Sequence, residues 1–107
     1  MEFLVLGKGK EVMLTLPPSV LLNLLEAAIP HMDEQGKGGK FREFHYMPGW
    51  NRFMNISVAD SAEELSKNMM KNPALGLLDI EIYPLTDGAE AWKDMTKALK
   101  SAQQTAA

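Results

Sequence analysis

The sequence predicts an α+β fold of the ferredoxin-like kind, in which helices cover one face of an antiparallel four-stranded sheet. The first observation is that segments alternating apolar with polar residues, typical of strands with one dry and one wet face, recur between helical patterns. The second is residues 55–83, which read as a strand, a capped helix, a proline-containing turn and another strand. The order strand, helix, strand therefore occurs twice, and one more helix follows.

Length and composition predict a single domain over residues 1–107. The 107 residues, 46% of them hydrophobic and 23% charged, suffice for one modest core. A formal charge of −3 gives no attraction to nucleic acid or to an anionic membrane. The lack of cysteine removes disulfides and thiolate chemistry and fits a reducing compartment. Because the first residues lack the basic segment of a signal peptide, and no apolar run is long enough to span a membrane, we predict a cytoplasmic protein.

The first strand is predicted over residues 11–16, where every second residue is apolar. Residues 1–10 then form an N-terminal extension, and Pro17 ends the strand.

A long helix is predicted over residues 20–35, with Ser19 as its cap. Pro30 should kink this helix or end its first segment. Its apolar stripe is wider than contact with one sheet requires, so we expect it also to touch another subunit. The glycine-rich residues 35–40 are predicted to be a flexible connector.

The second and third strands are predicted at 41–47 and 52–59, joined by a Pro-Gly turn. Asp60 and Glu63 form a capping-box pattern for a helix that ends near Lys71, before Pro73.

The fourth strand is predicted at 77–83. A second capping-box pattern, Asp87 with Glu90, opens a final helix. Its apolar residues at helical spacing predict packing against the same subunit or a neighbour, and residues 101–107 should fray.

One face of the predicted sheet stays open, since both right-handed crossovers return on the same side. A three-residue hairpin loop over 48–50 would place His45 beside Phe53. The open face then collects these side chains: Thr15, Glu43, His45, Phe53, Asn55, Ser57, Asp79, Glu81 and Tyr83. Two copies that press these faces together would enclose a polar cavity, in which carboxylates gain proton affinity.

His45 is the candidate proton carrier on this face, because histidine titrates near neutral pH. Glu43, Asp79 or Glu81 can orient it or share its proton. Equally, these groups can serve only to hydrogen-bond across the interface or to pack. His31, near the end of the long helix, is expected to be a surface residue. Two histidines without a ligand spacing such as His-x-x-x-His give no case for a metal.

Three motifs resemble the muconolactone isomerase family. They are Asn55-x-Ser57-Val58-x-Asp60, Pro73 after the second helix, and Leu78-Asp79-Ile80-Glu81. The resemblance implies a dimeric α+β barrel, larger rings built from dimers, and catabolism of aromatic compounds. Members of the family shift a double bond in an unsaturated lactone.

The chemistry implied is abstraction of a proton beside a carbonyl and its return at another carbon. A cation should hold the carboxylate of the lactone. Asn55, Ser57, Asp79 and Glu81 match the family positions. The chain departs from the family at Glu43, where the family has histidine, at His45, where it has an aromatic residue, and at Arg52-Phe53, which replace a His-Tyr pair.

The sequence therefore leads to a cofactor-free, isomerase-like enzyme acting on a small anionic carbonyl compound. His45 or Glu43 is the expected base, and Arg42 or Arg52 the expected anion-binding residue. Further substrate contacts are expected from these residues: Phe53, Asn55, Ser57 and Tyr83. The alternative is a non-enzymatic barrel protein that binds a small molecule or acts as an assembly subunit. A third interpretation is a monooxygenase whose cavity houses haem or an aromatic substrate.

Overall fold

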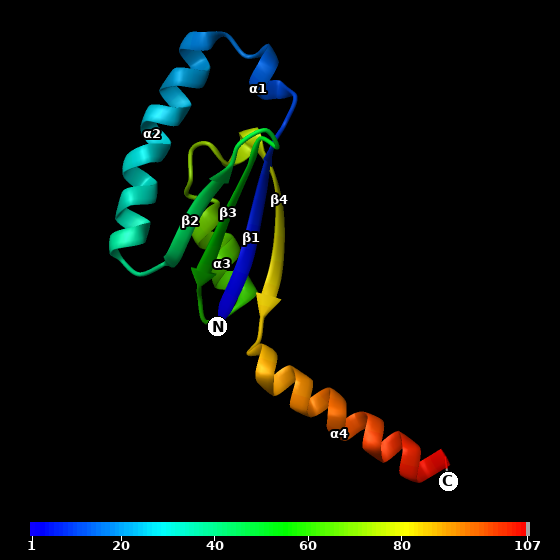
Figure 1. Ribbon diagram of the computed structural model, residues 1–107. Coiled ribbons are helices and arrows are strands. Elements are labelled where there is room, and N and C mark those ends of the chain that lie inside the picture. Colours follow the sequence, from blue (N-terminus) through cyan, green and yellow to red (C-terminus); the bar gives the residue numbers. More distant parts are fainter. Residues whose placement is uncertain (107) are drawn as a thin grey trace.

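The computed structural model describes residues 1–106 and has a two-layer α+β architecture (Figure 1). Its elements are β1 (Glu2–Gly9), α1 (Val12–Thr15), α2 (Pro18–Lys37), β2 (Phe41–Met47), β3 (Arg52–Val58), α3 (Ala62–Met69), η1 (Leu75–Leu77), β4 (Leu78–Leu85) and α4 (Gly88–Ala106). The four strands form one antiparallel sheet in the order β2-β3-β1-β4. The predicted βαββαβ arrangement with an added C-terminal helix is confirmed.

The first strand lies earlier than predicted. Residues 2–9, predicted to be an N-terminal extension, form β1, a central strand of the sheet. Residues 11–16, predicted to be the strand, contain the short helix α1, and Leu14 there is 88% exposed. The prediction was wrong because residues 3–6 of β1 are all apolar and lack the alternation that marks a strand, whereas an alternation of only six residues, as in 11–16, is ambiguous.

The helix α2 is longer at both ends than predicted. It begins at Pro18, and Pro17 rather than Ser19 occupies the capping position without a side-chain hydrogen bond. Proline suits the first helical turn, where its missing N–H has no partner to lose. The helix also continues through Pro30 to Lys37, so the expected glycine-rich connector shrinks to a short turn around Gly39, whose φ is +72°.

The β2-β3 hairpin differs from the prediction by one residue, and this reverses one strand. Met47 pairs with Arg52, which leaves a four-residue loop in which Gly49 and Asn51 have positive φ. His45 therefore pairs with Met54, not with Phe53. Because side chains alternate with period two, this shift turns every side chain of β3 to the other face of the sheet.

The helix α3 starts one residue later than its predicted capping box. Ser61 accepts a hydrogen bond from the N–H of Glu64 (3.1 Å), and the Glu64 carboxylate accepts one from the N–H of Asp60 (2.8 Å). These bonds satisfy donors that an open helix end would leave unpaired. Before α4, the predicted cap is present, since Asp87 Oδ2 accepts the N–H of Glu90 at 3.0 Å.

Two small apolar cores hold the helices. Phe3, Val5, Ala59 and Leu65 pack α3 against the sheet. Around Ala28, Ala74 and Leu77, a second cluster packs α2 against η1 and the α1 segment. Since α2 is held by η1 and α1, space remains between it and the middle of the sheet.

The helix α4 extends away from the body (Figure 1). The radius of gyration is 18.7 Å, against about 13 Å for a compact domain of this length. Residues 101–106, predicted to fray, belong to α4, and Ala107 lies outside the described residues. No helix within residues 1–106 has the length and apolar character needed to cross a bilayer.

Candidate active site

A cavity of about 610 Å³ lies between the sheet, α2 and α3. This volume is within the range of about 300–1,000 Å³ typical of pockets for small molecules. Its floor is the helix-facing side of the sheet, including Val5, Gly7 and Ile80. The separate packing of α2 and α3 on two different cores thus opens a space large enough for a ligand.

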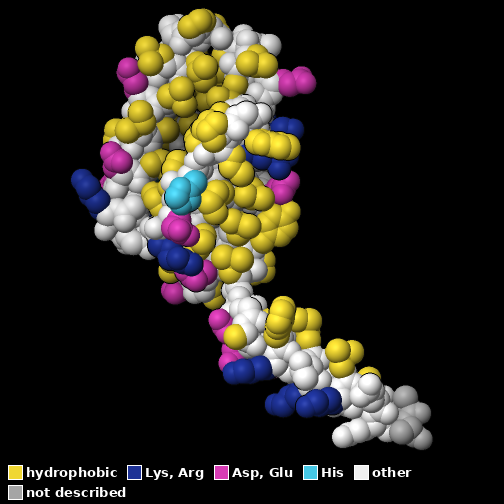
Figure 2. All heavy atoms as spheres, viewed as in Figure 1, with side chains coloured by type: hydrophobic (Ala, Val, Ile, Leu, Met, Phe, Trp, Pro, Cys, Tyr) yellow, Lys and Arg dark blue, Asp and Glu magenta, His cyan; other side chains and the backbone are white. Residues whose placement is uncertain are grey.

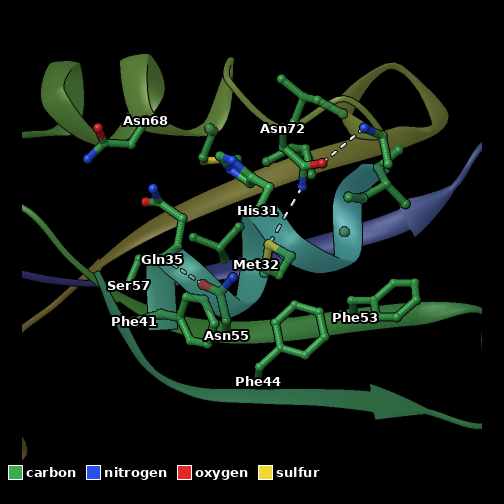
Figure 3. A pocket seen from close by; sticks show the side chains of 18 of the residues that line it. His31, Met32, Gln35, Phe41, Phe44, Phe53, Asn55, Ser57, Asn68 and Asn72 are labelled. Atoms are coloured by element: carbon green, nitrogen blue, oxygen red, sulfur yellow. Dashed lines mark hydrogen bonds between the residues drawn. The ribbon is translucent and has the colours of Figure 1, made fainter. Parts of the chain in front are cut away.

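Phenylalanines form one wall of the cavity. Phe41 and Phe44 of β2 and Phe53 of β3 all line it, with ring centroids 5.7 Å and 5.8 Å apart along the series (Figure 3). Phe41 and Phe44 are three residues apart, so simple alternation would put them on opposite faces. The register shift between Phe41 and Glu43 corrects this, because a β-bulge at Arg42 inserts one extra residue.

Polar side chains converge on the cavity from the two helices (Figure 3). His31 and Gln35 come from α2, Asn68 from α3, and Asn72 from the turn that follows α3. Asn72 is fixed in place because its Oδ1 accepts the N–H of Ala74 (2.9 Å) and its Nδ2 donates to the sulfur of Met32 (3.7 Å).

Across from these helices, Asn55 and Ser57 of β3 face the cavity. The Ser57 hydroxyl donates to Asn55 Oδ1 at 2.6 Å, which orients the amide and leaves its NH₂ group as a donor. Ser57 is buried, with 5% of its surface exposed. An imidazole on one side and fixed amides on both sides are the groups needed to move a proton and to stabilise an enolate oxygen.

His31 corrects the sequence prediction, which made it a surface residue. It is half-buried and lines the cavity. The prediction failed because it placed the site on the opposite side of the sheet, so α2 was read only as a cover. A signal was present: His31 lies three residues after Ala28 and four before Gln35, and positions three and four apart share one helix face.

Seven of the predicted site residues lie away from the cavity. Arg52 lies at the hairpin end of β3. The other six occupy the open face of the sheet, in two groups at its opposite edges. Arg42, Glu43 and His45 are on β2, and Asp79, Glu81 and Tyr83 are on β4. With β3 and β1 between them, the two groups are roughly 14 Å apart, three strand spacings of about 4.8 Å. A single chain does not bring them together.

The β2 group is held by ion pairs. Arg42 contacts the carboxylate of Glu2 and lies 3.7 Å from that of Glu43. His45 Nε2 lies 3.9 Å from Glu43 Oε1. Figure 2 shows histidine, acidic and basic side chains gathered at this edge, with hydrophobic side chains over the middle of the open face.

In the β4 group, the Tyr83 hydroxyl donates to Glu81 Oε2 at 2.8 Å. This hydrogen bond, and then the negative charge of Glu81, raise the pKa of Tyr83 above its ordinary value of 10.0. Asp79 lies 4.0 Å from Lys10.

Three predicted substrate contacts do line the cavity. Phe53, Asn55 and Ser57 were expected on the open face, but they pair with Gly7, Val5 and Phe3, whose side of the sheet the helices cover. Their place on the helix side follows from the four-residue hairpin loop described above. In exchange, Met54 and Ile56 lie on the open face.

No family model matches the sequence, and no curated protein matches it. Solved structures do match the fold. Muconolactone isomerase has a TM-score of 0.68 at 21% identity, over 81% of this chain and 90% of that one. A 5-chloro-2-hydroxyhydroquinone dehydrochlorinase from Burkholderia phenoliruptrix, solved with 2,5-dihydroxybenzoquinone, has a TM-score of 0.60 at 17% identity, over 84% of this chain and 98% of that one.

Both similar proteins are enzymes by name. Identities of this size establish architecture and leave the reaction open. The protein has the fold of muconolactone isomerase.

Proposed function

We propose that the protein is a cofactor-free enzyme that moves a proton within a small cyclic carbonyl compound bound between the sheet and the helices. The observation that carries this proposal is His31, the one imidazole among the groups that line an otherwise mainly apolar cavity with fixed amides around it. Carboxylates are weaker candidates there, because Asp33 at the cavity edge is exposed.

The proposed reaction is a double-bond shift. His31 removes a proton from the carbon beside the carbonyl, and the electron pair moves into a dienolate. An amide donor such as Asn55 stabilises the negative oxygen, and the proton returns at another carbon. Donors held in place in a water-poor site stabilise this charge more than water would, because they need no reorganisation.

The charges around the cavity narrow the substrate class. The lining residues that can carry a positive charge are His31 and Lys40, and Lys40 Nζ lies 4.0 Å from a carboxylate oxygen of Glu64. Both arginines considered for anion binding lie on the other face. We therefore propose a substrate with an apolar ring and at most one negative charge, seated on the phenylalanine wall.

We also propose that a second copy covers the open face of the sheet. Its middle is apolar, with Leu4 and Leu6 of β1 beside Met54 and Ile56 of β3, and its edges are charged. An apolar centre with a polar rim is the usual composition of a stable interface.

The two histidines of the chain give a matched test of the site. His31→Asn and His45→Asn remove one imidazole each, from the cavity and from the open face. Deuterium uptake from D₂O into muconolactone and other unsaturated lactones or enones, followed by NMR, detects proton abstraction without knowledge of the product. We expect His31→Asn to slow the exchange by about 10²–10⁴-fold, the usual contribution of a general base.

The His45→Asn variant should retain the exchange rate of the unmodified protein. Loss of exchange in this variant, with assembly intact, would place the base between two copies on the open face, where Glu43 lies beside it. If none of the compounds exchanges but some raise the melting temperature, the protein is a binding protein rather than an isomerase. An absorption spectrum of the purified protein tests the haem monooxygenase alternative directly.

A further inference from the structure

Ser57 and Asn55 form a polar pair within the apolar floor of the cavity. Both side chains lie on the helix side of β3, and the Ser57 hydroxyl donates to Asn55 Oδ1 at 2.6 Å (Figure 3). Ser57 is only 5% exposed, and a hydroxyl buried to this degree needs a hydrogen-bond partner within the protein. The direction of its one bond therefore decides what the pair presents to a ligand.

The neighbours of Ser57 fix that direction. Across the sheet, Ser57 pairs with Phe3 on β1 and with Phe41 on β2. Paired side chains share one face of the sheet, and neither phenylalanine has an acceptor to offer. Because a hydroxyl has a single proton to donate, that proton goes to Asn55. The amide must then turn its carbonyl oxygen toward Ser57.

The amide nitrogen of Asn55 is thereby turned into the cavity. Figure 3 shows it on the side of the amide away from Ser57. Asn55 pairs with Val5 on β1 and Phe44 on β2, whose side chains cannot accept a hydrogen bond either. The half-buried NH₂ group thus faces the cavity and receives no acceptor from the side chains paired with it.

An amide held in one orientation recognises one kind of oxygen. An asparagine that turns over by 180° presents either a donor or an acceptor, whereas Asn55 beside Ser57 presents donors alone. A carbonyl or enolate oxygen accepts from them. A hydroxyl in the same place brings a proton of its own, which the amide cannot accept, and a polar group left unpaired in apolar surroundings weakens binding.

We infer that Ser57 is a positioning residue that makes the cavity select a carbonyl oxygen over a hydroxyl at Asn55. The substrates are then cyclic ketones or lactones and their enolates, and the corresponding alcohols are rejected. This inference rests on the proposed function for the place of the carbonyl, and it adds the residue that enforces the choice.

A ketone and its alcohol test the selection. 1-Indanone and 1-indanol are neutral, carry an aromatic ring for the phenylalanine wall and differ at one oxygen. Dissociation constants come from ligand-observed NMR titrations. We expect the unmodified protein to bind 1-indanone at least about tenfold more tightly, the effect of one unpaired polar group. Ser57→Ala frees the amide to turn over, so the ratio of the two constants should fall toward one.

Two further variants separate positioning from a merely structural role. Ser57→Thr keeps the hydroxyl and should restore the ratio. Ser66→Ala removes an exposed hydroxyl on α3 and is the matched control, which should keep the ratio of the unmodified protein.

Asn55→Asp tests the direction of recognition without removing Ser57. At pH 8 the carboxylate accepts the Ser57 proton with one oxygen and presents the other, an acceptor, to the cavity. The preference should therefore reverse, with 1-indanol bound more tightly than 1-indanone. Circular dichroism of each variant confirms that the fold is retained.

The carbonyl stretching band of bound 1-indanone reports the hydrogen bond directly. It should lie at a lower wavenumber in the unmodified protein and in Ser57→Thr than in Ser57→Ala. The inference is wrong if the unmodified protein does not prefer the ketone, or if Ser57→Ala and Ser66→Ala give the same ratio and the same band. These results are separate from the proposed reaction, because binding needs no base and deuterium exchange in His31→Asn tests the proton transfer by itself.

Discussion

Glu81 and Tyr83 show how a single hydrogen bond on the open face affects titration. The phenol donates to the carboxylate, so ionisation of Tyr83 would both break the bond and place two negative charges together. The pKa of Tyr83 in the folded chain is therefore above 10.0, its value in the unfolded chain. The contribution of this bond to stability is complete below pH 10 and is lost as the pH rises through the folded-state pKa.

This shift is measurable by tyrosinate absorbance in a Tyr46→Phe background, where Tyr83 is the remaining tyrosine. We expect Glu81→Gln to move the midpoint down, because the amide keeps an acceptor but removes the charge. Identical midpoints with and without the substitution would show that Glu81 does not act on Tyr83.

At the same scale, the prediction of which side chains line the site depended on one turn, the loop between β2 and β3. The motif around Asn55 and Ser57 was recognisable in the sequence, and so was the importance of these two side chains. Their direction was not, because a hairpin loop of three or of four residues fits Pro-Gly-Trp-Asn equally well and each loop turns β3 to a different face. His31 was missed for a different reason, because the site was predicted on the face of the sheet away from α2.

At the scale of elements, the strand β1 is the clearest difference between expectation and structure. Phe3 is 2% exposed and lies in the core with Val5 and Leu65, whereas Leu14, in the segment predicted to be the strand, points into solvent. Phe3→Ala should lower the free energy of unfolding by about 3–5 kcal/mol, the usual cost of a cavity left by a buried aromatic residue.

Leu14→Ala is the control for this substitution and should change stability by less than about 0.5 kcal/mol, as is usual for a surface position. Urea denaturation of both variants gives the two values. A larger loss for Leu14→Ala than for Phe3→Ala would contradict the assignment of β1.

Elements with strong local signals were predicted well. The β2 strand matches its predicted bounds, and α3 and α4 begin next to acids or hydroxyls that satisfy their free N–H groups. The helix α2 does not end at Pro30, the second alternative of the prediction, but continues to Lys37. Local rules gave the type of element, and packing decided its length.

At the scale of the whole molecule, the proposed contact between copies is the open face of the sheet. The apolar centre of the open face predicts that a charge placed there separates subunits. Ile56→Glu should therefore shift sedimentation to a smaller species while the circular dichroism spectrum stays the same. The side chain would carry a charge into the middle of an interface, which is costly without a partner.

Leu14→Glu adds the same charge at an exposed position on α1, outside the sheet, and should leave the assembly unchanged. If Ile56→Glu sediments like the unmodified protein, the open face is not the contact between copies, and the function of its charged edges must be sought elsewhere.

The sequence by itself determined the class of fold and most of the helices and strands, because periodicity, prolines and capping residues act over a few neighbouring positions. It also pointed to Asn55 and Ser57. The tertiary structure alone decided which face of the sheet encloses a cavity. That choice depends on the hairpin register, on the bulge at Arg42 and on the two separate cores that hold α2 apart from the sheet. The cores join residues distant in the chain, and the register and the bulge depend on how two strands pair, which no pattern within one strand records.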